Sequence, residues 1–325
     1  MRLTTRPRRL GKTRNLSMIQ RFIENTKESN AYLFENLKIS REGEEYLKHQ
    51  GQYPVITISL KGMKQETFEG ALYNFKYSVM SEYNRHSEIL KSDKLSPGNR
   101  KHFENVYYVK ETDEFIFYNA LRLLSDCLCE AYEKNVIILI DEYDVPLENA
   151  YFCGFYDKMV SFIRRVFESV LKTNSSLEFA ILTGCLRISK ESIFTGLNNL
   201  KVYPITENIF SQYFGFTQEE VEELAVSYDL ADRLPEMKEW YDGYRFGKTE
   251  IYNPWSIIQY ISSATGGNEI SCKPYWINTS SNSIVHQLVS QSNQQTRNKI
   301  ETLIAGGSVS AEINENTVYA DINVN

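Results

Sequence analysis

The sequence predicts an α/β fold in which a mainly parallel β-sheet is flanked by helices. Short aliphatic runs alternate with amphipathic segments up to about residue 206, which is the pattern of repeated strand–helix units. The run Val136–Ile140 is continuously aliphatic, as expected of a central strand covered on both faces. Beyond residue 206 the chain is aromatic-rich and mostly helical in pattern. We therefore expect an α/β domain over residues 1–206 and a smaller helical domain, lid-like or winged-helix-like, over residues 207–325.

Local patterns predict the individual elements. A helix is expected to begin near Lys12, because Leu16, Ile19 and Phe22 recur at helical spacing. Thr217 followed by Glu220 forms a capping-box pattern that predicts another helix start. The other expected elements are a strand within 53–62, a long helix over 65–91, a loop over 92–102, helices over 112–134 and 157–171, and strands over 136–140, 177–183 and 201–205.

Composition narrows the functional class. The 325 residues are 42% hydrophobic and 13% aromatic, enough for a core, and the longest aliphatic run is far shorter than the roughly 20 residues of a membrane-spanning helix. No secretory pattern opens the chain, and its five cysteines form no C-x-x-C pair, so neither disulfides nor a zinc site are indicated. We expect a cytoplasmic protein without membrane contact.

The N-terminus is basic although the net charge of the chain is −6. Residues 1–23 contain seven basic residues and no acid. The stretch "TRPRRLGKTR" (5–14) has two interpretations, a basic arm for RNA or DNA or a divergent phosphate-binding loop of the form G-x-x-x-x-G-K-[ST]. In the second interpretation Gly11, Lys12 and Thr13 match the motif, and Arg6 stands where the first glycine belongs.

A second motif lies about 130 residues downstream and favours the phosphate loop. "NVIILIDEYDVP" is an aliphatic strand ending in Asp141 and Glu142, the pattern that ATPases use opposite their phosphate loop. Asp141 and Thr13 are expected to ligate Mg²⁺, and Glu142 to polarise the attacking water. Lys12 is expected to contact the β- and γ-phosphates of ATP.

The rest of the loop and a third strand end supply further candidates. The backbone N–H groups from Leu10 to Thr13 are expected to bind phosphate, and the loss of the first glycine to be offset by guanidinium contacts. These nucleotide-contacting candidates are Arg6, Arg8, Arg9, Leu10, Gly11, Lys12 and Thr13. In "FAILTGCLR", Thr183 is placed to sense phosphate or orient water, and Arg187 to reach phosphate or a neighbouring subunit; an ordinary strand-end threonine and a solvated arginine are the alternatives.

The assembled motifs resemble those of the bacterial and archaeal predicted AAA-ATPase-like family. The matching stretches run in the family's order over nearly the whole chain and are "TRPRRLGKTRNLSM", "YPVITISLKG", "VIILIDEYDVPLENA", "FAILTGCLRISKESIFTGLNNL", "FGFTQEEV", "EWYDGYRFG", "IYNPWSII" and "YWINTSSN". The resemblance implies a P-loop NTPase fold of the AAA type that uses ATP and Mg²⁺, with arginine in place of the first loop glycine. Family members often continue into a PD-(D/E)XK nuclease-like domain. No such residue set is visible here and only five residues precede Arg6, so the chain looks like a member truncated at both ends.

Two functional hypotheses follow from the sequence. In the first, the chain binds ATP, hydrolyses it slowly and regulates a partner protein or an effector domain. In the second, it is a non-catalytic interaction module whose degenerate loop holds nucleotide or nucleic acid. Loss of nucleotide binding in Lys12→Ala distinguishes the first from the second, for which salt-steep DNA or RNA binding is expected.

Overall fold

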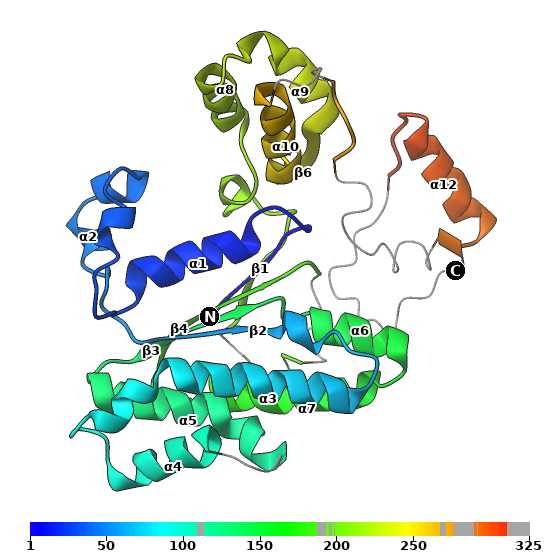
Figure 1. Cartoon of the computed structure of the whole chain (residues 1–325). Coiled ribbons are helices and arrows are strands. Elements are labelled where there is room, and N and C mark those ends of the chain that lie inside the picture. The colour runs from blue at the N-terminus through cyan, green and yellow to red at the C-terminus, as the bar shows by residue number, and fades with distance from the viewer. Residues whose placement is uncertain are drawn as a thin grey trace.

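A five-stranded, fully parallel sheet forms the centre of the computed structural model (Figure 1). The structure describes residues 1–108, 114–186, 193–194, 197, 199–266, 271–275, 289–290 and 292–310. The strands are β1 (Arg2–Thr5), β2 (Val55–Ser59), β3 (Val136–Asp141), β4 (Leu177–Gly184) and β5 (Lys201–Tyr203), in the order β2-β3-β4-β1-β5. The expected α/β class with a mainly parallel sheet is confirmed.

Helices cover both faces of this sheet. The described helices of this part of the chain are α1 (Lys12–Ile23), α2 (Glu44–Leu47), α3 (Phe68–Arg85), α4 (Pro97–Tyr107), α5 (Glu114–Tyr132), α6 (Val145–Cys153) and α7 (Tyr156–Phe167), which continues into a π-helical turn at Glu168–Lys172. Figure 1 shows α1 on one side of the sheet and α3, α5 and α7 on the other. None of the described helices is both long and apolar enough to cross a membrane.

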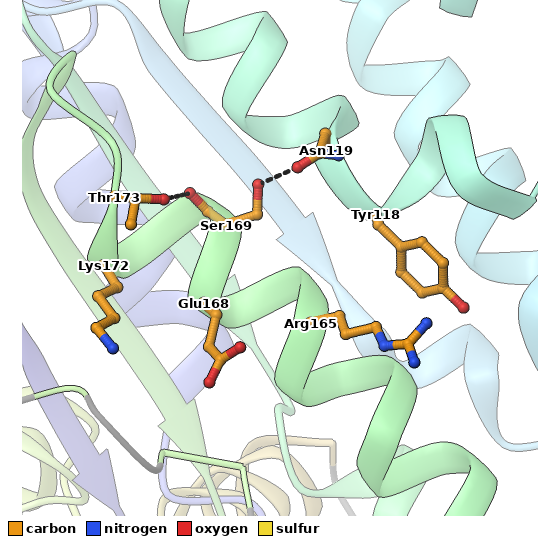
Figure 2. Close-up of a pocket in the computed structure, with 7 residues that line it drawn as sticks. All are labelled: Tyr118, Asn119, Arg165, Glu168, Ser169, Lys172 and Thr173. Atoms are coloured by element: carbon orange, nitrogen blue, oxygen red, sulfur yellow. Dashed lines mark hydrogen bonds between the residues drawn. The ribbon is translucent and has the colours of Figure 1, made fainter.

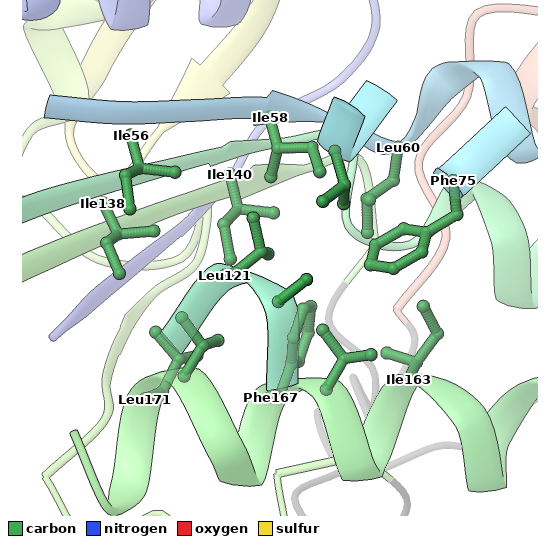
Figure 3. Close-up of a cluster of buried hydrophobic side chains, with 14 of the residues drawn as sticks. Ile56, Ile58, Leu60, Phe75, Leu121, Ile138, Ile140, Ile163, Phe167 and Leu171 are labelled. Carbon is green, nitrogen blue, oxygen red and sulfur yellow. The ribbon is translucent and has the colours of Figure 1, made fainter. Parts of the chain in front are cut away.

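The two faces of the central strand explain this layering. All six residues of β3 are buried, and alternate side chains point to opposite faces. Ile137 and Leu139 pack in a small cluster with Leu16 of α1. Ile138 and Ile140 belong to the larger cluster on the other face, which Figure 3 shows between the sheet and the helices. A continuous aliphatic run is therefore needed here, as the sequence predicted.

Two element predictions in the middle of the chain are wrong. The expected helix over 65–91 ends as an α-helix at Arg85, and the expected loop over 92–102 contains the start of α4. The Ser96 hydroxyl accepts a hydrogen bond from the Asn99 N–H at 3.4 Å, and Pro97 occupies the first turn, where its missing N–H costs nothing. The Pro-Gly pair was thus a helix start and not a turn.

Beyond residue 206 a second group of elements has its own hydrophobic cluster. It contains α8 (Gln218–Ser227), α9 (Leu234–Tyr241), the antiparallel hairpin β6 (Asp242–Phe246) and β7 (Thr249–Tyr252), and α10 (Pro254–Thr265); α12 (Gln294–Ile304) follows. The capping box of Thr217 and Glu220 is present. The mostly helical pattern expected for this region is wrong at the hairpin, whose turn includes Gly247 at φ 54°. The domain boundary near residue 206 stays a prediction.

Candidate functional site

The carboxyl ends of three neighbouring strands converge beside the start of α1. Thr5 at the end of β1 pairs with Gly184 at the end of β4, and β3 ends next to them at Asp141. The loop after β1 leads directly into α1. The "TRPRRLGKTR" stretch, the Asp-Glu motif and Thr183 therefore lie together at one edge of the sheet, although up to 178 residues separate them in the sequence.

The loop presents backbone N–H groups at the beginning of α1. Arg9 and Gly11 adopt positive φ angles of 66° and 83°, and Gly11 is the N-cap of the helix without a side-chain cap. Within the described part of the chain, no acceptor bonds the N–H groups of Lys12, Thr13 and Arg14. A Cβ added to Gly11 would meet nothing within 4 Å. Open space and unpaired N–H donors at a helix start are the features of an anion site.

Lys12 is buried and folds back over the loop. Its Nζ donates to the carbonyl oxygens of Arg6 at 2.8 Å and Pro7 at 2.9 Å, and lies 3.4 Å from the Sγ atom of Cys185. These contacts place the ammonium between the phosphate loop and the end of β4. The lysine is thus held by neutral acceptors, which an anionic ligand can outcompete.

The Asp141 carboxylate joins the two motifs. Its Oδ2 atom accepts a hydrogen bond from the Thr13 hydroxyl at 2.6 Å, and its Oδ1 atom accepts from the Thr183 hydroxyl at 2.5 Å and from the Glu142 N–H at 3.0 Å. Asp141 and Thr183 are both buried. The loop, the acidic strand end and the threonine that the sequence singled out therefore meet on one carboxylate.

Glu142 has an unusual backbone conformation at this point. Its φ of 53° lies in the left-handed region, which non-glycine residues rarely adopt and which tends to occur at functional sites. Burial raises the pKa of its carboxyl, and the neighbouring Asp141 charge raises it further. A carboxyl with raised proton affinity beside a phosphate loop is suited to accept a proton from water.

Arg6 points away from the open side of the loop. Its guanidinium is fully buried and donates to the carbonyl oxygens of Thr5, Tyr203 and Phe210 at 2.8, 2.9 and 3.2 Å. Burial lowers the pKa of this side chain to about 10. These contacts leave the expected contact between the Arg6 guanidinium and phosphate without support.

The other loop residues also make contacts inside the fold. Arg8 forms an ion pair with Glu148 of α6 at 3.2 Å, and the Arg9 guanidinium lies 4.4 Å from the ring centre of Trp255. Leu10 is completely buried. The basic stretch is thus folded onto the protein, unlike a solvated arm for nucleic acid. Arg187 lies outside the described residues.

Sequence reasoning missed Asp144, which connects two of the strand ends. This residue is 1% exposed, and its Oδ2 atom accepts hydrogen bonds from the N–H groups of Cys185 and Leu186, both at 2.8 Å. Burial raises the pKa of its carboxyl. The available signal was the third acid in "DEYD", three residues after Asp141.

A separate hollow lies on the helices and not at the strand ends (Figure 2). Its volume is about 460 Å³, and its lining residues come from α5, α7 and the π-helical turn: Tyr118, Asn119, Arg165, Glu168, Ser169, Lys172 and Thr173. Ser169 donates to Asn119 Oδ1 at 2.7 Å, and the Arg165 guanidinium lies 5.3 Å from the centre of the Tyr118 ring. No sequence-predicted site residue lines it.

The parallel sheet, the loop opening α1 and the acidic end of β3 define a P-loop NTPase-like protein. The chain belongs to the family described as "Predicted AAA-ATPase", which matches residues 1–194. It is also 26% identical over 164 residues to a protein of Azotobacter chroococcum mcd 1 named "Uncharacterized protein in vnfD 5'region". That match covers 49% of this chain and 30% of the relative. Membership supports nucleotide binding as the general property of the fold.

Proposed function

We propose that this chain binds ATP with Mg²⁺ at the loop between β1 and α1 and hydrolyses it slowly. The observation that carries this proposal is the shared carboxylate of Asp141, which bonds both Thr13 of the loop and Thr183 of β4. In an ATPase, this connection places metal ligand, loop and phosphate sensor around one centre.

The phosphate contacts follow from charge and geometry. The unpaired N–H groups of Lys12, Thr13 and Arg14 and the dipole of α1 favour an anion at the start of the helix. Lys12 is held a short distance away by two carbonyl oxygens. Its ammonium exchanges these neutral partners for the β- and γ-phosphate oxygens, because a charge-assisted bond is the stronger one.

The donor set at Asp141 fits Mg²⁺. A hydroxyl and a carboxylate, 2.6 Å apart at Thr13 and Asp141, are hard oxygen ligands of the kind this ion prefers. The described residues contain no cluster of three or more His, Cys, Asp and Glu that could hold a metal alone. The remaining ligands would come from phosphate oxygens and water, as is usual for Mg²⁺. When bound, the ion neutralises charge on the transferred phosphoryl group.

Glu142 is the proposed residue that orients the attacking water and accepts its proton. Its carboxyl is next to Asp141, and its raised pKa makes it a stronger base than an exposed glutamate. Thr183 is proposed to report the γ-phosphate, because its hydroxyl already bonds the metal-ligating carboxylate. We further propose that the nucleotide state regulates a partner protein or an effector domain.

Mg-ATP binding and phosphate release by the wild-type chain, Lys12→Ala and Glu142→Gln test this proposal. Lys12→Ala is expected to abolish binding, and Glu142→Gln to keep binding while lowering turnover at least 100-fold, the typical share of a general base. Lys48→Ala, at an exposed lysine outside the site, is the matched control and should behave as wild type.

Two results would contradict it. If the wild-type chain does not bind Mg-ATP, the proposal that it binds nucleotide is wrong. If it binds DNA or RNA with a steep salt dependence that Lys12→Ala leaves unchanged, the interaction-module hypothesis replaces it.

A further inference from the structure

Arg6 connects the phosphate loop with the elements beyond residue 206. Its side chain bonds the carbonyl oxygens of Tyr203 at the end of β5 and of Phe210 in the following segment. The guanidinium carbon lies 5.1 Å from the ring centres of both Phe214 and Phe246. Phe246 belongs to the β6–β7 hairpin, so one loop side chain contacts an element 240 residues away in the sequence.

The backbone of the same residue contacts the phosphate-binding side of the loop. The Arg6 N–H donates to the Gly184 carbonyl at 3.1 Å, and the Arg6 carbonyl accepts from Lys12 Nζ at 2.8 Å. A change in the position of the Lys12 ammonium therefore acts directly on the residue that holds the hairpin.

Leu10 provides a second, independent connection. It is completely buried in a cluster with Phe214, Phe246 and Ile251. The packing there is close, since a Cβ on Gly215 would lie 3.2 Å from Leu10 Cδ2 and 2.3 Å from Ile251 Cγ2. The loop and the hairpin thus share one apolar cluster, and neither can shift without the other repacking.

The phosphate-binding loop and the hairpin stabilise each other, so a change in either one affects the other. A buried guanidinium is costly unless acceptors and aromatic faces replace its water. Here the replacements come from the 203–214 segment and the hairpin. If the hairpin undocks, Arg6 loses these partners and the loop loses its support. If the loop rearranges, the hairpin loses its anchor.

We propose that Arg6 is a positioning residue that couples nucleotide binding at Lys12 to docking of the β6–β7 hairpin. This proposal rests on the proposed function, because the coupling requires a ligand at the loop. Phosphate bound by the N–H groups at the start of α1 holds the loop in the conformation that presents Arg6 to its partners beyond the sheet, which gives the ligand the differential contact that a shift in docking requires. Because the two equilibria are linked, the factor by which bound nucleotide strengthens hairpin docking equals the factor by which hairpin docking strengthens nucleotide binding. A variant with a weaker hairpin contact should therefore bind nucleotide more weakly.

Phe246→Leu tests this coupling from the hairpin side, with Phe103→Leu as the matched control. Both phenylalanines are buried, but Phe103 lies in α4 within the main core, where its ring contacts those of Tyr83 and Tyr107. Both variants should lose stability. Only Phe246→Leu is expected to raise the Kd for Mg-ATP, by about tenfold, a typical coupling factor. Arg6→Lys keeps the positive charge but lacks the planar guanidinium group, and it should raise the Kd for Mg-ATP by a similar factor.

Amide hydrogen exchange of the wild-type chain, with and without Mg-ATP, tests the coupling without relying on a folded variant. Saturating Mg-ATP should slow exchange of the amides of Thr249–Tyr252, and Arg6→Lys should remove that protection. Equal Kd values for the two phenylalanine variants, or hairpin amides that do not respond to bound Mg-ATP, would overturn the coupling alone. A wild-type chain that binds no Mg-ATP would overturn the proposed function, and the coupling with it.

Discussion

Glu142 combines a strained backbone with a carboxyl whose charge the fold disfavours. Compared with the unfolded chain, the fold favours the protonated form more strongly, because burial and the Asp141 charge raise the pKa of the Glu142 carboxyl above its ordinary value of 4.5. The stability gained from proton uptake is present below the unfolded pKa and is lost as pH rises through the higher folded pKa. At neutral pH the charged carboxylate therefore costs stability, which is consistent with the role proposed for Glu142.

Replacing Glu142 by glutamine is expected to raise the melting temperature at pH 7 by about 2 °C, because the neutral amide avoids the disfavoured charge. The gain should shrink at pH 4, where the wild-type carboxyl takes up its proton. Thermal unfolding of wild type and variant at both pH values measures the change in melting temperature. Glu66→Gln, at an exposed glutamate, is the control. A melting temperature at pH 7 equal to or below that of wild type would contradict the assigned environment.

The sequence predicted which side chains meet at the site but not how all of them point. Lys12, Thr13, Asp141 and Thr183 follow from motif spacing, because the carboxyl ends of parallel strands share one edge. The inward direction of Arg6 depends on carbonyl groups about 200 residues away, which no local pattern encodes. The contact of Arg9 with Trp255 was missed for the same reason. The chemical roles of these residues stay predictions.

At the scale of elements, the segments after β3 and β4 are fastened to each other. The Tyr143 N–H donates to the Thr183 carbonyl at 3.1 Å, and the Tyr143 hydroxyl donates to the Leu186 carbonyl at 2.5 Å. The Asp144 carboxylate accepts hydrogen bonds from the N–H groups of Cys185 and Leu186. Gly184 lies in the middle of these contacts, between Thr183 and Cys185. This fastening keeps Thr183 in place beside Asp141.

Gly184→Ala is expected to lower the free energy of unfolding by about 1–3 kcal/mol, because the new Cβ would lie 2.5 Å from Tyr143 Cε1 and 2.7 Å from Asp144 Oδ1. Urea denaturation measures the change. Gly98→Ala is the control of opposite sign: nothing lies within 4 Å of that Cβ in α4, and alanine favours a helix by about 0.5–1 kcal/mol. Equal effects of the two substitutions would show that Gly184 is not confined.

Element boundaries were harder to predict than element types. The aliphatic strands were recognised because burial on both faces leaves a continuous pattern. Helix α4 was missed because Pro97 and Gly98 resemble a turn, and the β6–β7 hairpin because its alternation is weak and its aromatics suggest a helix. In both regions, tertiary packing selects a structure that local propensity leaves open.

At the scale of the whole molecule, an ionic network of two buried carboxylates and a partly exposed arginine ties three elements together. Arg85 of α3 bonds Glu24 after α1, Glu82 one turn earlier in α3, and the Val55 carbonyl of β2. The two glutamates are 5% and 7% exposed at their side chains. Charges in such positions stabilise only as a complete set.

Arg85→Met is expected to lower the unfolding free energy by about 1–2 kcal/mol, since it leaves two buried carboxylates without the guanidinium; the loss is smaller than for a fully buried pair because Arg85 itself is partly exposed. Lys27→Met removes an exposed lysine from its ion pair with Glu88 and should leave stability nearly unchanged. Guanidinium chloride titration of both variants provides the comparison. Loss of stability of the same size in both would contradict the role of Arg85 as the partner of two buried carboxylates.

The place of β1 in the sheet sets an order of assembly during synthesis. β1 precedes the other four strands of the sheet in the sequence, yet Arg2 pairs with Ile181 on one side and with Lys201 on the other. Its backbone groups have no sheet partners until some 180 further residues have left the ribosome. The loop that carries Lys12 is therefore translated well before the strands that fix it. A nascent chain that ends before β4 and β5 should be unable to hold nucleotide, however well its β2–β3 region has folded.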